Sequence, residues 1–350
     1  MTDAAMPSRV AIILVNWNGW RDCVECLSSI VASDAMQTAD VYLVDNASTD
    51  GSVEQIQAWC AEPRPVAPYK HFEGVRHIGP EPIAFRVWLA NGQAVPHDAT
   101  SPQLTLVHSG GNLGFAGGNN VGIVAAGLER YSHFWLLNTD TVIRHDALGH
   151  LLTRASAEPI PGLVGSSLIY YHEPGLIQAM GGAMLNLRTA IANHIGDRSA
   201  VDQLPSDAAA IEAQMSYVVG ASMFASRGFI ERVGLLQEDY FLFYEEADWA
   251  FRGGPCRALG YAPLSIVYHK VGGSSAQKLS EYSLNALYRS RLRFAARFLP
   301  QSLPWVRGMI AFEALRHAVK GRWMPARVAA KNGFSTFRKA SLPGLAAPQI

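Results

Sequence analysis

The sequence predicts an α/β protein built on a doubly wound, mostly parallel sheet. The stretch Val10–Val15 is a continuous apolar run rich in β-branched residues, which is typical of a buried parallel strand. Strand and helix patterns then alternate with short loops between them, as in α/β folds. With 49% apolar and 17% charged residues, the 350-residue chain can bury a large core, in one large domain or two.

The first half of the chain supplies the start of this sheet. We expect strands at Val10–Val15, Val41–Val44, Leu104–Val107 and Phe134–Leu137, with helices over 21–32, from Ser52, over 121–130 and over 146–155. Residues 61–108 hold seven of the nineteen prolines and break the alternation, so they predict an insertion. Within it, the segments 84–90 and 93–95 flank Asn91-Gly92, which indicates a hairpin.

The second half continues the pattern and ends in a helical tail. Strands are expected over 163–171, 180–186, 217–225 and 265–269, a short helix over 229–233 and a mobile polar loop over 196–213. Another helix begins near Glu245. Helices over 282–298 and 305–323 then form a tail, which gives a domain at 1–280 and a tail at 281–350.

Charge is unevenly distributed along the chain. The net charge is zero, which gives no support for a nucleic-acid partner, but residues 280–340 hold twelve Lys or Arg against two Glu. The apolar run near the N-terminus is too short for a signal peptide, and no stretch is long enough for a membrane span, so we expect a cytoplasmic protein.

Polar side chains follow two of the predicted strands. Asp45 opens the loop 45–52, and Asn138 and Asp140 follow the strand at 134–137. Open α/β sheets bind ligands at the carboxyl ends of their strands. A carboxylate beside an amide suits a hard cation such as Mg²⁺, and in extended backbone Asn138 and Asp140 would point the same way. The alternatives are a turn at 138–140 and helix capping by 45–52.

Three later features carry further chemistry. The glycine-rich run 110–120 allows close approach of a ligand to the backbone, although its spacing does not match a dinucleotide motif. Glu245, Glu246 and Asp248 crowd beside aromatic residues, which should raise at least one pKa as in a general base. The alternative is compensation of the helix dipole. His269 ends the last strand. It is expected either to contact a ligand or phosphate or to serve as a structural residue.

The order and spacing of these motifs resemble family 2 of the glycosyltransferases, most of all its bacterial rhamnosyltransferase-like branch that builds surface polysaccharides. The resemblance covers roughly residues 9–290. It rests on the segments 15–19, 44–52, 112–120, 137–140 and 243–249, followed by His269. It implies a GT-A fold with a nucleotide-binding half and an acceptor half.

The resemblance also implies a role for each motif. Asp140 corresponds to the metal-binding aspartate of the family's DxD motif, where Asn138 is a departure at the first position, and His269 matches a histidine that completes the metal site in some relatives. Glu246 corresponds to the catalytic base, with glutamate in place of aspartate, so Glu245 and Asp248 remain alternatives. The residues implied in nucleotide binding are Asn16, Asn18, Asp45, Asn46, Ser48, Asn112, Gly114, Asn119 and Asn138.

The implied reaction is inverting transfer of a rhamnose-like deoxysugar or a hexose from a dTDP- or UDP-linked donor. The acceptor is a hydroxyl of a saccharide or lipid-linked saccharide, and Mg²⁺ or Mn²⁺ is the cofactor. The basic tail predicts either a peripheral position on the inner face of the membrane or helices that pack on the domain with solvated basic faces. The competing functions are a nucleotidyltransferase and a non-catalytic subunit that binds a nucleotide sugar.

Overall fold

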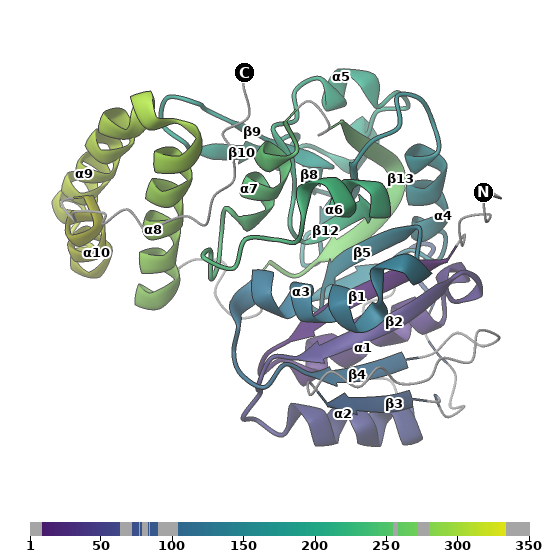
Figure 1. The fold of residues 1–350 in the computed structure, drawn as a ribbon. Coiled ribbons are helices and arrows are strands. Elements are labelled where there is room, and N and C mark those ends of the chain that lie inside the picture. The colour runs from purple at the N-terminus through teal and green to yellow at the C-terminus, as the bar shows by residue number, and fades with distance from the viewer. Residues whose placement is uncertain are drawn as a thin grey trace. The chain divides into compact units, whose positions relative to one another are not determined.

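The computed structural model describes two compact units. The described residues are 9–63, 72–76, 78, 83, 85–89, 104–254, 258–271 and 280–333. The first unit comprises Met1–Leu185, Ala192–Phe241 and Glu245–Ala276, and the second comprises Asn186–Ile191, Leu242–Tyr244 and Gln277–Ile350. Figure 1 shows the sheet of the first unit and the helices of the second.

The first unit is built around a sheet of ten described strands, of which five parallel neighbours form one side (Figure 1). Their spatial order is β3 (Phe85–Leu89), β4 (Leu104–His108), β2 (Ala39–Asp45), β1 (Val10–Asn16) and β5 (His133–Asn138). Every residue of β2 and nearly every residue of β1 is buried, as their continuous apolar sequences require. The mostly parallel sheet of the prediction is therefore confirmed.

The other side of the sheet mixes strand directions. After β5 the order is β12 (Ser222–Ser226), β7 (Leu163–Tyr170), β13 (Leu259–His269) and β6 (Thr141–Ile143), and β8 (Ile177–Met180) pairs with β7. Strand β12 runs antiparallel to both of its neighbours, whereas β7 and β13 are parallel. The predicted strand at 217–225 is divided into β11 (Tyr217–Val218) and β12, and the break between them becomes important at the site.

Helices follow the strands much as the sequence predicts. They are α1 (Trp20–Val31), α2 (Ser52–Ala61), α3 (Gly114–Ala126), α4 (Ala147–Ala155), α6 (Arg227–Val233) and α7 (Glu245–Arg252). Helix α3 packs on β1 and β2, and α4 packs on β7 and β13. Gly234, with φ of +82°, ends α6, since a residue without Cβ adopts this backbone at little cost.

The glycine-rich run is helical from Gly114 onward, which corrects the expectation that the helix begins at Val121. Helix α3 begins at Gly114, and its glycines serve close packing on the sheet. A Cβ at Gly118 would lie 2.7 Å from Cγ1 of Val15, and one at Gly122 would lie 2.4 Å from Cγ2 of Ile13. Because Gly118 and Gly122 have no side chains, α3 can lie directly against β1. The close approach that these glycines allow is therefore to another part of the protein.

The segment predicted as a mobile loop at 196–213 contains ordered structure. It includes η3 (Val201–Gln203) and α5 (Ala209–Glu212), and it follows β10 (Ala192–His194), which pairs with β9 (Gly182–Leu185) in a small sheet completed by β11. The carboxylate of Glu212 accepts hydrogen bonds from Arg154 Nε at 2.6 Å and from the backbone N–H of Tyr261 at 2.7 Å. These contacts, which the local composition does not reveal, hold α5 in place.

Part of the predicted insertion belongs to the main sheet. Strand β3 falls within the first predicted hairpin strand and pairs in parallel with β4. The turn at Asn91-Gly92 and the second hairpin strand at 93–95 lie outside the described residues.

The second unit contains the helices of the predicted tail. They are α8 (Glu281–Phe298), η5 (Pro300–Ser302), α9 (Leu303–Val319) and α10 (Trp323–Gly333), and α8, α9 and α10 pack on one another. The predicted helix at 305–323 ends at Val319 because Gly321, with φ of +67°, turns the chain before α10. Arg291 Nε donates to the carbonyl of Thr189 at 3.0 Å, which holds the segment 186–191 to α8. Within the described residues, no helix is long and apolar enough to span a bilayer.

We expect Gly122→Ala to lower the free energy of unfolding by about 1–3 kcal/mol, because the added methyl must displace Ile13 or move α3 off the sheet. The exposed Gly149 on α4 is a matched control, since a Cβ there would meet no atom within 4 Å. Gly149→Ala should stabilise by about 0.5–1 kcal/mol. Urea unfolding of both variants checks this, and a gain of stability in both would contradict the packing role of Gly122.

Candidate functional site

The strand register brings the predicted polar strand ends together at one edge of the sheet. Asn16 at the end of β1 lies opposite Asp45 at the end of β2, and Asp45 lies opposite His108 at the end of β4. On the other side of β1, Val15 pairs with Asn138 of β5. This is the edge at which open α/β sheets bind ligands.

The two loops after β1 and β2 are joined through Ser48. Its hydroxyl accepts hydrogen bonds from Asn16 Nδ2 at 3.1 Å and from the backbone N–H of Asn18 at 3.0 Å. The Asp45 carboxylate accepts from the backbone N–H of Ser48 at 3.2 Å and from Asn16 Nδ2 at 3.4 Å. The loops therefore form one polar surface with a carboxylate fixed at its base.

One aromatic residue in this region was missed by the sequence reasoning. Trp17 lies between Asn16 and Asn18 and is 56% exposed. An exposed indole beside fixed polar groups can stack on a planar ligand such as a nucleobase. Its signal in the sequence was its position in a polar turn directly after a buried strand, where a large apolar residue is unexpected.

The predicted nucleotide residues Asn46, Asn112 and Asn119 make contacts within the protein. Asn46 Nδ2 donates to Asn112 Oδ1 at 3.2 Å and to the carbonyl of Gly114 at 3.1 Å, and its Oδ1 accepts from the backbone N–H of Leu113. Asn119 Nδ2 donates to the carbonyl of Phe115 one turn earlier in α3. These side chains position the start of α3 at the edge of the sheet.

Asp140 and His269 meet at the same edge. His269 Nε2 lies 3.2 Å from Asp140 Oδ1, and His269 Nδ1 lies 2.8 Å from Gln178 Oε1. Strand β5 ends at Asn138, so Thr139 and Asp140 form a turn, and Asn138 and Asp140 do not share one extended strand. This corrects the expectation that their side chains align, because it is the turn that presents Asp140 to His269.

Asp140 and His269 supply part of a binding site for a divalent cation. When His269 Nδ1–H donates to Gln178, the lone pair of Nε2 faces a carboxylate oxygen, and such a pair of acceptors suits a shared cation. The described residues contain no cluster of three or more His, Cys, Asp or Glu suited to a metal. Asp140 and His269 would therefore hold a cation together with oxygens from a ligand or from water, which is how Mg²⁺ is usually bound.

A half-buried ion cluster anchors the residues that follow β13. The backbone N–H of Lys270 donates to the carbonyl of Asp140 at 2.9 Å, and its ammonium group pairs with Asp22 and Glu25 of α1. Burial lowers the pKa of Lys270, but hydrogen bonds to the two carboxylates outweigh burial, and the pKa is raised. Lys270 thus ties His269 and Asp140 to α1.

The acidic start of α7 separates into two kinds of carboxylate. Asp248 is buried and pairs with Arg252 Nε at 2.6 Å, and Arg252 also donates to the carbonyls of Val233 and Leu235. Glu245 and Glu246 instead each keep one buried carboxylate oxygen that has no hydrogen-bond partner. Asp248 therefore holds the helix in place, whereas one carboxylate oxygen of each glutamate is left without a partner.

Burial shifts the titration of these glutamates. It raises the pKa of Glu245 well above its ordinary value, with a further contribution from the charge of Glu246. It also raises the pKa of Glu246 to about 7. Phe243 and Tyr244 precede them with φ of 68° and 70°, and two consecutive left-handed residues other than glycine are typical of functional sites.

The break between β11 and β12 connects the two acidic regions. The backbone N–H of Asn138 donates to the carbonyl of Ala221 at 3.0 Å. At the adjacent Gly220, a Cβ would lie 3.8 Å from Cδ of Glu246 and 3.9 Å from Cζ of Phe115. The segment 219–221 therefore lies between the end of β5 and Glu246, with Gly220 beside the Glu246 carboxylate. Neither Gly220 nor Gln178 stands out in the sequence, because each matters only through contacts with residues far along the chain.

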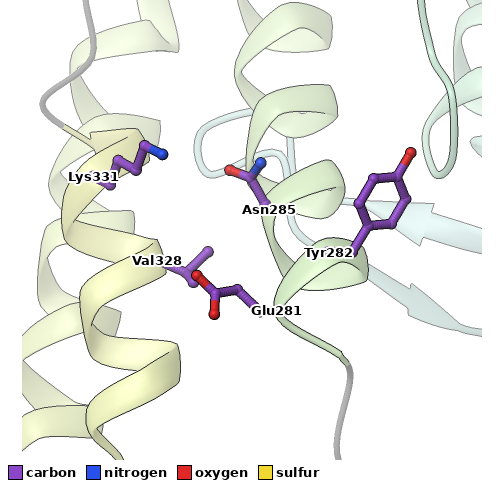
Figure 2. A pocket seen from close by; sticks show the side chains of 5 residues that line it. All are labelled: Glu281, Tyr282, Asn285, Val328 and Lys331. Carbon is purple, nitrogen blue, oxygen red and sulfur yellow. The ribbon is translucent and has the colours of Figure 1, made fainter.

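A pocket in the second unit is lined by none of the site residues described above. It is lined by Glu281, Tyr282, Asn285, Val328 and Lys331, and its volume is about 280 Å³. Figure 2 shows these side chains on α8 and α10. None of the predicted site residues lies there, so the strand ends of the first unit remain the candidate site.

Comparisons with known proteins identify the fold. No model of a protein family matches the sequence, and neither does any curated protein. Among solved structures, the chain is similar to the mannosyltransferase PcManGT from Pyrobaculum calidifontis in complex with GDP-Man and Mn²⁺. The TM-score is 0.50 and the identity is 15%, over 95% of this chain and 89% of that one.

A second similar structure is GalNAc-T7 with UDP, GalNAc and Mn²⁺. Here the TM-score is 0.58 and the identity is 10%, and the match covers 94% of this chain and 55% of that one. The chain thus spans about half the length of GalNAc-T7. At these identities the likeness establishes the fold, and the chain has the GT-A glycosyltransferase fold that the sequence predicts.

Arg252→Met should lower the free energy of unfolding by about 3–5 kcal/mol, because it removes the guanidinium that pairs with the buried Asp248. The matched control is Arg227→Met on α6, whose pair with the exposed Glu231 also spans one helical turn. That change should cost about 1 kcal/mol or less. Chemical unfolding measures both, and equal effects would mean that Asp248 is not held by Arg252.

Proposed function

We propose that this protein is an inverting glycosyltransferase that uses a nucleoside-diphosphate sugar. One observation carries the proposal: Glu246, a half-buried carboxylate with a raised pKa, is linked through the segment 219–221 to the end of β5, and the turn that follows β5 places Asp140 beside His269 of β13. Transfer of a sugar needs a base near the acceptor and a polar site for the diphosphate, and these two groups supply both.

The donor nucleotide would bind over the ends of β1, β2 and β5. Asp45 and the polar loops around Ser48 offer hydrogen bonds to the base or ribose, and Trp17 offers a face for stacking. The diphosphate would then lie toward Asp140 and His269. A divalent cation bound by these two residues would neutralise the charge that develops on the departing diphosphate.

Glu246 would act as the base. It accepts the proton of the acceptor hydroxyl while that oxygen attacks the anomeric carbon. The bond from this carbon to the diphosphate oxygen breaks at the same time, and its electron pair leaves with the diphosphate. Attack from the opposite face inverts the anomeric configuration.

The structure supports Glu246 over the two alternatives that the sequence leaves open. The pKa of Glu245 is raised by burial and by the adjacent Glu246, so Glu245 holds its proton more strongly. Asp248 is occupied by Arg252. A general base works best with a pKa near the working pH, and the raised pKa of Glu246, about 7, suits that role at neutral pH.

The proposal extends to the substrates. The motifs that resemble the rhamnosyltransferase-like branch support a rhamnose-like deoxysugar or a hexose on dTDP or UDP. They also support a saccharide or lipid-linked saccharide acceptor in the synthesis of cell-surface polysaccharide. PcManGT with GDP-Man and GalNAc-T7 with UDP, both with Mn²⁺, support a nucleotide-sugar donor and a divalent cation in general.

Glu246→Gln should lower kcat by about 10²–10⁴-fold, since the amide cannot accept the proton. In the wild type, kcat/KM should rise as pH increases through about 7, because Glu246 must lose its proton to act. Transfer assays with a panel of nucleotide sugars measure both quantities. The exposed Glu231→Gln is the control and should leave the pH profile unchanged.

Nucleotide binding without transfer or hydrolysis by the wild type would support a non-catalytic subunit instead. Incorporation of a nucleotidyl group into product would support a nucleotidyltransferase. Full activity of Glu246→Gln would reject Glu246 as the base.

Asp140→Ala should abolish the rise in melting temperature that a nucleoside diphosphate produces in the presence of Mg²⁺ or Mn²⁺, because one of the two protein ligands is lost. Thermal shift measurements with UDP, dTDP and GDP, with and without metal, test this and also reveal the preferred nucleotide. Asp34→Ala is a control, since Asp34 lies before β2, at the opposite end of the strand from the site. An equal metal-dependent shift in Asp140→Ala would place the cation elsewhere.

A further inference from the structure

Helix α9 has an unusual row of exposed apolar side chains. The row lies along α9 and continues into the first residue of α10. Its members, with their exposed fractions, are Trp305 (56%), Phe312 (56%), Leu315 (62%), Val319 (80%) and Trp323 (72%). We refer to these five residues as the α9 stripe.

The helical members of the stripe lie on one face. Trp305, Phe312 and Val319 are separated by seven residues each, which is close to two helical turns, and Leu315 lies one turn from both Phe312 and Val319. Val306 and Ile310 on the inner side are fully buried where α9 packs on α8 and α10. A helix that is apolar on both sides is normally covered on both sides.

Positive charge borders the stripe. Arg316, Lys320 and Arg322 are exposed. The one carboxylate in residues 303–323, Glu313, pairs with the buried Arg291 of α8 at 2.9 Å. The stripe therefore combines apolar side chains with cations whose charge is not cancelled on α9 itself.

The segment 186–191 of the same unit extends this surface. The guanidinium of Arg188 lies 3.6 Å from the centre of the Trp305 ring. The neighbouring Leu187 is 54% exposed. Another apolar side chain and another cation thus lie at the Trp305 end of the stripe.

We infer that the α9 stripe binds peripherally to the surface of an anionic lipid bilayer. Apolar side chains would enter the boundary between headgroups and acyl chains, and the bordering cations would contact anionic headgroups. Tryptophan prefers this boundary because its ring is apolar while its N–H remains hydrogen-bonded, and the stripe has a Trp at each end.

Charge favours a bilayer over a second copy of the chain. A symmetric dimer places the same patch of both copies face to face. Arg316, Lys320 and Arg322 of one copy would then approach those of the other, and like charges repel. Anionic headgroups complement the same cations. The inference goes beyond sugar transfer and can be tested without a donor, an acceptor or a metal.

Sedimentation with lipid vesicles tests the inference. The full-length protein is mixed with vesicles of phosphatidylcholine alone, or of equal parts phosphatidylcholine and phosphatidylglycerol. The stripe variant combines Phe312→Gln, Leu315→Gln and Val319→Gln. The matched control combines Val124→Gln, Ile160→Gln and Leu264→Gln, which removes three comparably exposed apolar residues from the first unit. Circular dichroism melting checks that both variants fold.

We expect the wild type and the control to bind the anionic vesicles. The affinity of the stripe variant for these vesicles should be lower by a factor of about ten or more. Lys320→Gln, which keeps the stripe, should weaken binding about fivefold, as one charge at such a surface does. The exposed Arg232→Gln on α6 should not change it. The single substitution keeps the test valid if the triple variant unfolds.

Three outcomes would overturn the inference. One is a wild type that does not sediment with anionic vesicles at low salt. A second is equal binding by the wild type, the stripe variant and Lys320→Gln. In the third, the wild type is a dimer by light scattering and does not bind vesicles, and the stripe variant is a monomer. That result would assign the stripe to a second copy of the chain.

Discussion

Parallel pairing of β2, β1 and β5 is the constraint on which the candidate site depends. Backbone hydrogen bonds fix the register of the three strands, so their carboxyl ends meet at one edge. Asn16 and Asp45 come into contact because β1 and β2 stop at the same level. The glycines of α3 contribute to the same arrangement, since they let the helix cover these strands at close range.

The antiparallel strand β12 brings the two halves of the first unit together. It pairs with β5 on one side and with β7 on the other. The preceding break at 219–221 contacts Asn138 through its backbone and leaves Gly220 beside Glu246. A strand inserted in this way brings the end of β5 near Glu246, although Asn138 and Glu246 lie about a hundred positions apart in sequence.

Environment divides chemically similar carboxylates between two roles. Asp248 is paired with Arg252 and stabilises α7, whereas Glu245 and Glu246 each have one buried carboxylate oxygen without a hydrogen-bond partner. Burial of these carboxylate groups raises the pKa of both glutamates, that of Glu246 to about 7. Similarly, Gln178 orients the imidazole of His269 toward Asp140.

The sequence by itself determined most strands of the sheet, the helices between them and the polar strand ends, because apolar runs and turn residues are local signals. It did not indicate β6 or the first half of β13. It did not determine the start of α3, the ordered segment around Glu212 or the separate role of Asp248. It also did not single out Gln178 or Gly220. Each of these depends on a contact with a residue far along the chain, such as Ile13, Arg154 or Glu246. Tertiary structure decided them because burial and pairing arise only when distant segments meet.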